Sequence, residues 1–431
     1  MKKRLQSIAR AARIVRLGSS LAGDYVARQV QRPFLSAEAQ EAKLKTSRSK
    51  RARQFQEELS NLRGPVMKVG QALSMQTNAL APEWIEALSG LQMQAPPMHP
   101  SLMRAQFKSS TGKYPEEVFA SFEDEPFAAA SLGQVHHART KKGADVVVKI
   151  QYPAMREVIG SDFKLLRTAG FFARLTGHLK DSVIDEAHRG IMEETDYQQE
   201  ARNIEYFRKH LAPLPFLRIP AVHSEHSTDR VLVMSRVEGK RLQEFLADDP
   251  PQAVRDQLGA ELTRLFFFQL FRVGALHADP HPGNYLFKSD GTIGLVDFGC
   301  VKHVKPEVIR CYAQFWSREW LHDESLYAEI IRVIFGAVKS SKAPHIRQCM
   351  KAIAGFYDEF HPLTGGSGPL DLGEPKFMDA LAKMAAILLK NKFLSPEFLF
   401  LSRTEAGLCN ILHILKARVP TTKIAKEFVV W

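Results

Sequence analysis

The spacing of apolar residues divides the chain into strand-like and helix-like regions. Short apolar runs bounded by turn residues begin at Pro126-Phe127 and recur to about residue 238, with 146–150 and 230–235 as clear examples. Runs of this length and composition are typical of strands. Residues 102–114, the stretch after Gly239 and most of the chain after residue 308 read instead as helices. The pattern therefore predicts an α+β protein.

A hairpin is expected over residues 285–296. Two apolar runs, 285–287 and 293–296, flank the turn dipeptide Asp290-Gly291. This arrangement is a strong signal for two antiparallel strands joined by a tight turn. Polar loops stand directly before and after the hairpin, so it would bring their side chains to one end of the same small sheet. The side chains concerned are Asp279, Asn284 and Asp297.

These three side chains indicate a metal and phosphate site, because carboxylate and amide oxygens are hard ligands that suit Mg²⁺. The first loop contains His277-Ala278-Asp279, with Asn284 five residues after the aspartate, and Asp297-Phe298-Gly299 follows the hairpin. H-x-D, the later Asn and D-F-G form the catalytic-loop and metal-loop pattern of kinases. The alternative is a turn-rich loop beside an ordinary hairpin. The pairing of the two motifs favours phosphoryl transfer.

Residues 128–135 have the register of the kinase phosphate loop, G-x-G-x-x-G-x-V. Alanines replace the first two glycines, while Gly133 and Val135 match the pattern. Alanine has a narrower conformational range than glycine, so we expect the loop to lie further from the phosphates. The candidate nucleotide-binding residues of this loop are Ala128, Ala129, Ala130, Ser131, Gly133 and Val135.

The following strand carries Lys149 at the position of the phosphate-binding lysine of kinases. Strand alternation places Val147 and Lys149 on one face, where Val147 would cover an adenine ring while Lys149 reaches the phosphates. A solvated lysine at the end of an ordinary strand is the alternative. The strand over 230–235 suits the hinge, where backbone groups would bond the adenine edge. The hinge candidates are Met234, Ser235, Arg236 and Val237.

A kinase also needs a helix glutamate that holds its strand lysine on the nucleotide phosphates. Residues 193–203 read as one helical stretch with several acidic side chains. Glu200 is our choice, and Glu194 and Asp196 are the alternatives. A solvated acidic helix face fits the same spacing.

Most of the net charge of +12 lies near the N-terminus, where residues 1–63 hold fifteen Lys/Arg against five Asp/Glu. Residues 1–35 also carry apolar side chains at three- and four-residue steps. A basic amphipathic helix on an anionic membrane surface fits this pattern. A solvated helix packed on the main domain and a cleaved organelle transit peptide are alternatives. The segment lacks interleaved aromatics and any base-reading module, so no nucleic acid is expected as a partner.

The length of 431 residues exceeds one ordinary core, so two or three domains are expected. The four cysteines stand far apart without C-x-x-C spacing, which indicates a reducing compartment and no disulfide framework. No uncharged run approaches the roughly 18 residues of a membrane span. The apolar run 265–271 lies between Arg264 and Arg272 and is expected to be a buried helix segment.

In their order along the chain, these motifs resemble the AarF/UbiB family of atypical kinase-like proteins, and in particular its coenzyme-Q-biosynthesis branch without a C-terminal membrane span. The likeness also includes Lys68-Val69-Gly70-Gln71, the segments 149–153 and 194–201, and the tail segment 415–418. It runs from about residue 10 to the end of the sequence. H-x-D-x-H-P-G-N alone is less specific, because small-molecule kinases of the aminoglycoside type carry a similar loop.

The resemblance implies a two-lobed protein-kinase-like fold with a helical N-terminal extension that covers the active site. Lys149 would pair with Glu200, and Asp279 would stand where the catalytic base stands. Asn284 and Asp297 would hold Mg²⁺. The residues implied to join the extension to the kinase-like part are Lys68, Gly70 and Gln71 on one side and Glu194 and Asp196 on the other.

Four segments follow from this assignment. Residues 1–60 form the basic amphipathic segment, 61–125 the helical extension, 126–238 the N-lobe and 239–431 the C-lobe. The segment after Gly299 is short and lacks an A-P-E signal, so no obvious platform for a peptide substrate follows it.

We expect an MgATP-dependent atypical kinase or ATPase that supports isoprenoid-quinone (ubiquinone) biosynthesis at a membrane surface. The expected partners are ATP, anionic membrane lipid, and isoprenoid-quinone precursors or quinone-biosynthesis proteins, and a homodimer is left open. The expected location is cytoplasmic at the inner face of a bacterial membrane, or the matrix side of a mitochondrial one. The alternatives are a small-molecule kinase of the aminoglycoside or choline type and a nucleotide-gated pseudokinase scaffold.

Overall fold

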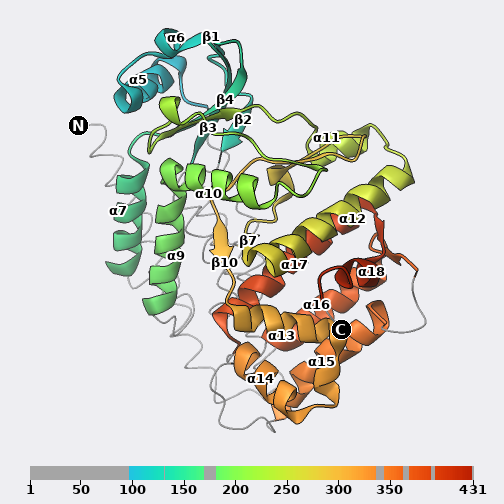
Figure 1. The fold of residues 1–431 in the computed structure, drawn as a ribbon. Coiled ribbons are helices and arrows are strands. Elements are labelled where there is room, and N and C mark those ends of the chain that lie inside the picture. Colours follow the sequence, from blue (N-terminus) through green and yellow to red (C-terminus); the bar gives the residue numbers. More distant parts are fainter. Residues whose placement is uncertain are drawn as a thin grey trace, which may run out of the picture. The chain divides into compact units, whose positions relative to one another are not determined.

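A computed structural model describes residues 97–130, 132–168, 181–335, 344–362, 368–389 and 394–429 (Figure 1). The basic segment 1–60 and the Lys68–Gln71 motif lie outside the described residues, and the expectations about them stay predictions. The chain divides into two units, which are described separately. The first unit holds the described residues up to Gln199 together with His223–Met234, and the second holds Glu200–Val222 and the chain from Ser235 onward.

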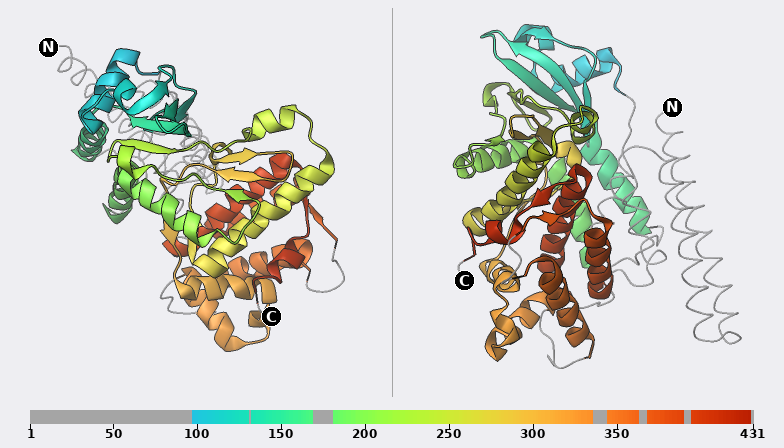
Figure 2. Two further views of the ribbon diagram at one scale, coloured as in Figure 1. Left: turned by 45° about the horizontal axis from the view of Figure 1, so that its top comes forward. Right: turned by 90° about the vertical axis from the view of Figure 1, so that its right-hand side faces the viewer.

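The first unit is built on a sheet, which is visible in both views of Figure 2. Its described part has five strands in the order β1-β3-β4-β6, with β2 paired to β3. The pairs β1–β3, β2–β3 and β3–β4 are antiparallel. β1 lies upstream of Pro126, where we expected the strand-rich region to begin. The strands are β1 (Phe119–Phe122), β2 (Ala128–Ala130), β3 (Gly133–Thr140), β4 (Asp145–Gln151) and β6 (Val231–Ser235).

One face of this sheet is covered by α5, and the core of the first unit lies between them (Figure 1). Met103 and Phe107 of the helix pack with alternate residues of β4, namely Val146, Val148 and Ile150. Each of these five side chains is almost completely buried. The alternation follows from the strand period of two residues, and it turns the other residues of β4 to the opposite face.

Of the remaining helices of the first unit, α6 precedes β1 in the chain, and α7, α9 and α10 lie between β4 and β6. α7 and α9 contact each other, and α10 starts at the end of this unit. The helices are α5 (Pro100–Thr111), α6 (Pro115–Val118), α7 (Met155–Thr168), α9 (Asp181–Glu194) and α10 (Tyr197–His210). The single helical stretch predicted over 193–203 is wrong: the chain breaks at Thr195-Asp196 between α9 and α10.

The described part of the second unit contains three small sheets. The predicted hairpin is present as β8 and β9, and Gly291 closes its turn with φ of 86°, a conformation that glycine adopts without strain. β5 adds to β9 in parallel, while β7–β10 and β11–β12 are separate antiparallel pairs. The strands are β5 (Leu217–Arg218), β7 (Ala275–His277), β8 (Tyr285–Phe287), β9 (Ile293–Leu295), β10 (Val301–His303), β11 (Leu370–Asp371) and β12 (Arg418–Val419).

Helices make up most of the second unit (Figure 2). The predicted buried segment 265–271 ends α12 and continues as one π-helical turn, Gln269–Val273. α12 packs against α17 and α18, and α16 packs against α15 and α17. The helices are α11 (Leu242–Ala247), α12 (Gln252–Phe268), α13 (Pro306–Ser317), α14 (Glu324–Phe335), α15 (Pro344–Phe360), α16 (Pro375–Leu389), α17 (Pro396–Leu415) and α18 (Thr421–Ala425), with 3₁₀ turns at Ser224–His226, Pro282–Asn284 and Glu319–Leu321.

Two expectations from the sequence concern disulfide bonds and membrane-spanning helices. Among the described residues, Cys300, Cys311, Cys349 and Cys409 form no disulfide bond. In the part of the chain that the structure describes, no helix combines the length and the apolar character needed to cross a membrane.

Candidate active site

The catalytic-loop motif begins at the end of β7 and closes with a 3₁₀ turn at Asn284. The side-chain amide of Asn284 donates to Oδ2 of Asp279 at 2.9 Å and to the carbonyl oxygen of Asp279 at 3.0 Å. His281 accepts a hydrogen bond on Nδ1 from the backbone N–H of Gly283 at 3.0 Å, which supports the turn. The loop is therefore closed on itself by its own polar residues.

The metal-loop motif lies beside this loop. The N–H of Val296 donates to the carbonyl oxygen of Asn284 at 3.1 Å, and the N–H of Ala278 donates to that of Cys300 at 2.9 Å. These two backbone bonds stand on either side of Asp297, whose Oδ1 accepts from the N–H of Gly299 at 3.0 Å. The structure thus brings Asp279, Asn284 and Asp297 together at one end of the hairpin, as the sequence pattern predicts. Their catalytic and metal-binding roles stay predictions.

Two residues of α10 hold the middle of the metal loop. The carboxylate of Glu200 accepts from the N–H of Phe298 at 3.5 Å, and the side-chain amide of Asn203 donates to the carbonyl oxygen of Phe298 at 2.9 Å. The ring of Phe298 is fully buried and lies 5.7 Å from that of Phe207. Asn203 was not predicted from the sequence. Its position three residues after Glu200, on the same helix face, was the signal available.

His277 joins the two loops. Its ring atom Nε2 donates to the carbonyl oxygen of Asp297. The backbone N–H of His277 donates to Oε1 of Gln269 at 2.7 Å. The Nδ1 atom is buried and has no hydrogen-bond partner among the described residues. Because Nε2 donates its proton to a backbone carbonyl, the ring serves as a structural link between the catalytic loop and the metal loop.

The oxygen atoms that these loops offer as ligands fit Mg²⁺. Asn284 directs its amide nitrogen at Asp279, so its oxygen is the atom left to bind a cation, beside the carboxylate of Asp297. Among the described residues no group of three or more His, Cys, Asp or Glu side chains is placed to hold a metal ion. A site with few protein ligands is usual for Mg²⁺, which keeps several waters and binds substrate phosphates.

In the first unit, the phosphate-loop segment is a β-hairpin of β2 and β3. Ala128 pairs with Val135, Ala129 with Gln134 and Ala130 with Gly133, while Ser131 lies outside the described residues. A Cβ atom at Gly133 would stand 2.2 Å from the carbonyl oxygen of Ile150. The glycine of this loop is therefore required by close packing against β4, independently of any contact with phosphate.

Lys149 lies on the face of β4 opposite the α5 core, and it is paired in register with Val135 of the hairpin. Its ammonium group lies 5.1 Å from the ring centroid of Tyr197, and the side chain is buried. Val147 is also buried on this strand. The shared face that strand alternation predicts for Val147 and Lys149 is consistent with this arrangement. Lys149 belongs to the first unit and Glu200 to the second, so their pairing stays a prediction.

The hinge candidates lie at the end of β6. Met234 is buried. The N–H of Ser235 donates to the carbonyl oxygen of Ala221 at 2.8 Å, and its hydroxyl oxygen accepts from the N–H of Ala221 at 2.8 Å. The backbone N–H of Ser235 is thus already hydrogen-bonded. The groups that this segment would offer to an adenine edge are the carbonyl of Ser235 and the backbone groups of Arg236 and Val237.

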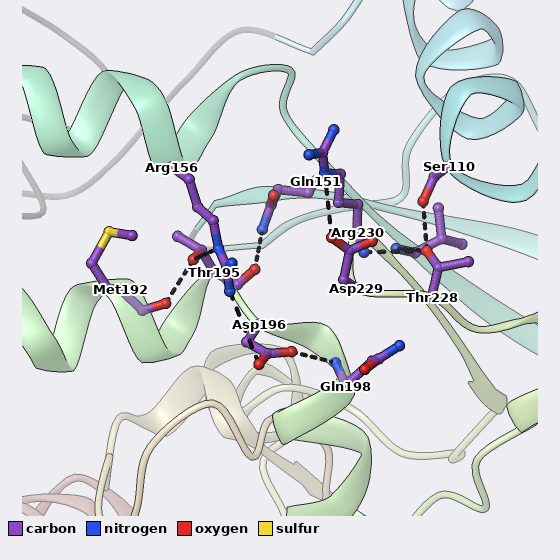
Figure 3. Close-up of polar contacts among 11 residues, drawn as sticks. Ser110, Gln151, Arg156, Met192, Thr195, Asp196, Gln198, Thr228, Asp229 and Arg230 are labelled. Atoms are coloured by element: carbon purple, nitrogen blue, oxygen red, sulfur yellow. Dashed lines mark hydrogen bonds and ion pairs between the residues drawn. The ribbon is translucent and has the colours of Figure 1, made fainter.

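The junction of α9 and α10 holds the acidic motif (Figure 3). Asp196 caps α10, because its Oδ1 accepts from the N–H groups of Gln198 and Gln199 at 3.0 and 3.2 Å. Arg156 of α7 donates to the hydroxyl of Thr195 at 2.9 Å and lies 4.0 Å from the Asp196 carboxylate. Glu194 is the last residue of α9. Contacts of Glu194 and Asp196 with Lys68, Gly70 and Gln71 involve residues outside the described part of the chain and stay predictions.

Gln151 ties this junction to the sheet. Its side-chain amide donates to the carbonyl oxygen of Thr195 at 3.0 Å, and its N–H donates to the carbonyl oxygen of Arg230 at 3.0 Å (Figure 3). Gln151 is almost fully buried. The K-I-Q-Y-P segment thus places a lysine and a glutamine on one strand face, with Lys149 above Tyr197 and Gln151 bonded to Thr195.

The sheet of the first unit and the catalytic and metal loops of the second define a kinase-like protein of mixed helix and sheet. The profile of the ABC1 atypical kinase-like domain matches residues 90–331. The chain belongs to this family.

Two curated relatives illustrate the family. The chloroplast protein ACTIVITY OF BC1 COMPLEX KINASE 8 of Arabidopsis thaliana is 32% identical over 266 residues, which cover 60% of this chain and 35% of that protein. The uncharacterized protein Rv0647c of Mycobacterium tuberculosis is 32% identical over 349 residues, covering 75% of this chain and 66% of that protein. The chain thus spans little more than a third of the first relative.

A solved structure agrees with the fold. The complex of Rv3197 with erythromycin from Mycobacterium tuberculosis has a TM-score of 0.63 and 28% identity, covering 91% of this chain and 98% of that one. The likeness therefore extends well beyond the residues that the family profile matches.

Proposed function

We propose that the protein is an atypical kinase or ATPase that uses MgATP. The observation that carries this proposal is the convergence of Asp279, Asn284 and Asp297, fixed by the Asn284–Asp279 hydrogen bond and the backbone bonds between the two loops. Asn284 and Asp297 would hold Mg²⁺, which supplies charge stabilisation for the phosphates when bound. Asp279 would accept a hydrogen bond from the attacking hydroxyl or water and orient it.

Peptides are poor candidates for the acceptor. The segment after Gly299 enters β10 directly, and this strand pairs with β7. Helix α13 then starts at Pro306. A protein kinase uses a longer activation segment at this point to shape its peptide platform. The short segment supports a small or lipid-linked acceptor, or water.

We further propose that the activity supports isoprenoid-quinone biosynthesis at an anionic membrane surface. This step rests on the resemblance of the sequence to the coenzyme-Q branch and on the basic composition of residues 1–63. A small-molecule kinase remains the second candidate, and it is favoured by one observation. The similar structure of Rv3197 was solved in complex with erythromycin, a small molecule.

Mg²⁺-dependent ATP hydrolysis tests the proposal, measured with and without anionic liposomes and a quinone-precursor phenol. Wild type should turn over ATP, and Asp297→Asn should lose Mg²⁺-dependent nucleotide binding. Asp290→Asn is the matched control, because Asp290 lies in the hairpin turn and its Oδ1 accepts from the N–H of Thr292, a bond that asparagine keeps. MgATP binding by Asp297→Asn at wild-type affinity would sink the proposal. Stimulation by liposomes would support the membrane surface, and stimulation by neither addition would contradict the quinone assignment.

A further inference from the structure

Helix α17 lies directly against the catalytic loop. At Gly407 of this helix an added Cβ atom would stand 2.2 Å from Cγ of Pro280 and 2.8 Å from its Cβ. Pro280 is the residue that follows Asp279 in the chain. Because glycine has no Cβ, its presence allows the helix backbone to approach the loop this closely. The helix therefore forms part of the wall that supports Asp279.

Arg403 shares this face of α17, since it precedes Gly407 by four residues. Its side chain is partly buried. Burial lowers the pKa of the Arg403 guanidinium, while the neighbouring Cys300 and then Asp279 raise it. An arginine keeps its charge throughout the working pH range of a protein. A permanent cation thus stands near the catalytic loop and near Cys300, the residue after the D-F-G motif.

The rest of α17 is anchored firmly enough to hold such a side chain in place. On another face of the helix, Glu405 accepts a hydrogen bond from the hydroxyl of Tyr312 at 2.5 Å. At its N-terminal end, Glu397 pairs with Lys305 at 2.6 Å. Further side chains along the helix are buried, among them Leu401, Leu408, Ile411 and Leu412.

We propose that Arg403 is a positioning residue for Asp279. Gly407 allows α17 to approach the catalytic loop closely enough for Arg403 to take this role. The Asn284 amide holds one carboxylate oxygen from within the loop, and the guanidinium acts on the same carboxylate from a helix far along the chain. Together they keep the carboxylate turned toward the reacting atoms. This inference rests on the proposed phosphoryl-transfer function and assigns to it a part of the fold outside the kinase motifs.

The test compares Arg403→Gln and Arg403→Lys with wild type in Mg²⁺-dependent ATP hydrolysis. Misplacement of Asp279 should lower kcat of Arg403→Gln on the order of 100-fold while KM for ATP changes by less than about threefold, because the nucleotide contacts stay intact. Arg403→Lys keeps the charge and should recover part of kcat. The control is Arg310→Gln on α13, an exposed arginine paired with Glu329 at 3.6 Å, which should behave like wild type.

Gly407→Ala gives a second, independent variant. Alanine is the better helix former by about 1 kcal/mol, so a helix without a close neighbour would gain stability. Against Pro280 the added methyl group should instead shift the loop and lower kcat at least about tenfold. Gly355→Ala in α15 is the matched control, since no atom lies within 4 Å of its added Cβ. Equal kcat values for Gly407→Ala and Gly355→Ala would overturn the role of Gly407.

Hydrogen exchange of the peptide covering residues 277–287 supplies a readout that needs no turnover. Faster exchange of this peptide alone in Arg403→Gln supports the proposal, even if wild type proves inactive and the proposed function fails. Active wild type with unchanged kcat and unchanged loop exchange in Arg403→Gln overturns the positioning role and leaves the function standing. Faster exchange throughout α12–α18, with no recovery by lysine, shows a general stabilising role and also overturns it.

Discussion

Asn284 donates its side-chain amide to both the carboxylate and the carbonyl oxygen of Asp279, at 2.9 and 3.0 Å. One residue therefore fixes the predicted base and, through its remaining oxygen, offers a ligand to the predicted Mg²⁺. These two tasks can be separated by substitution.

Asn284→Asp keeps an oxygen ligand for the metal but removes the donor to Asp279 and sets a second negative charge beside it. We expect its Mg²⁺ requirement to stay within a few-fold of wild type, while kcat falls on the order of 100-fold through the displaced carboxylate. Asn284→Ala loses both the ligand and the donor, so its Mg²⁺ requirement should rise as well. Titration of ATP turnover with Mg²⁺ measures both quantities. Wild-type turnover by Asn284→Asp would show that the hydrogen bond to Asp279 has no part in catalysis.

The hairpin and its loops were predictable because their signals are local. Asp290-Gly291 specifies the turn, the apolar runs specify the strands, and a two-stranded ribbon necessarily brings its flanking loops together. The helix break before α10 was also available locally, since an aspartate directly before Tyr197 is a typical N-cap. The long helical pattern on both sides concealed it.

Asn203, Arg403 and Gly407 could not be assigned from the sequence. Asn203 meets Phe298 and Gly407 meets Pro280 only because helices far apart in the chain pack on the same loops. No spacing rule relates residues so distant along the chain, and their side-chain types are ordinary for helices. Tertiary packing gives them their position.

Ala128→Gly tests the effect of the alanine-substituted phosphate loop. Ala128 of β2 is paired with Val135 of β3. Glycine at position 128 should therefore loosen the hairpin backbone without removing a packed side chain of any size. We expect a changed ATP affinity and a changed preference between ATP and ADP, with the unfolding temperature nearly constant. Nucleotide titrations with unchanged affinity for both nucleotides would refute the idea.

Gly133→Ala should act on stability instead. Its methyl group would stand 2.2 Å from the carbonyl oxygen of Ile150, and β3 must shift against β4 to make room. We expect destabilisation of about 1–3 kcal/mol, typical of overpacking. Gly160→Ala in α7 is the control in the same unit, since no atom lies within 4 Å of its Cβ, and it should be neutral or stabilising by up to about 1 kcal/mol. Urea unfolding of the two variants distinguishes the cases, and equal stability would contradict the packing argument.

Asp196 has both a structural role and a predicted regulatory one. Asp196→Ala removes the N-cap of α10 and should cost about 1 kcal/mol. Asp196→Asn keeps the cap and weakens the 4.0 Å contact with Arg156, which is half exposed and worth little. Its stability should match wild type. A change in ATP turnover of this stable variant would support the predicted contact with Lys68, whereas a loss of stability equal to that of Asp196→Ala would contradict the capping role.

Glu405 should make the stability of the second unit depend on pH. It lines a mostly apolar cavity of about 50 Å³, and burial raises its pKa to about 7 against the lowering effect of the Tyr312 hydrogen bond. Because the folded pKa lies above the unfolded one, this contribution to stability is complete below about pH 4.5. As the pH rises to about 7, this contribution to the free energy of unfolding falls by roughly 3 kcal/mol. Glutamine at this position carries no such charge.

The measurement must compare Glu405→Gln with wild type at each pH, because His361 acts in the opposite direction. Burial, and then the charge of Arg318, lower the pKa of His361 to about 3, so its contribution to stability is lost as pH falls from about 6.5. Urea unfolding followed by tryptophan fluorescence between pH 4.5 and 8 should show the variant gaining stability relative to wild type as pH rises, with the difference levelling off above about pH 7. Parallel pH profiles of the two proteins would mean that Glu405 is not held neutral in the fold.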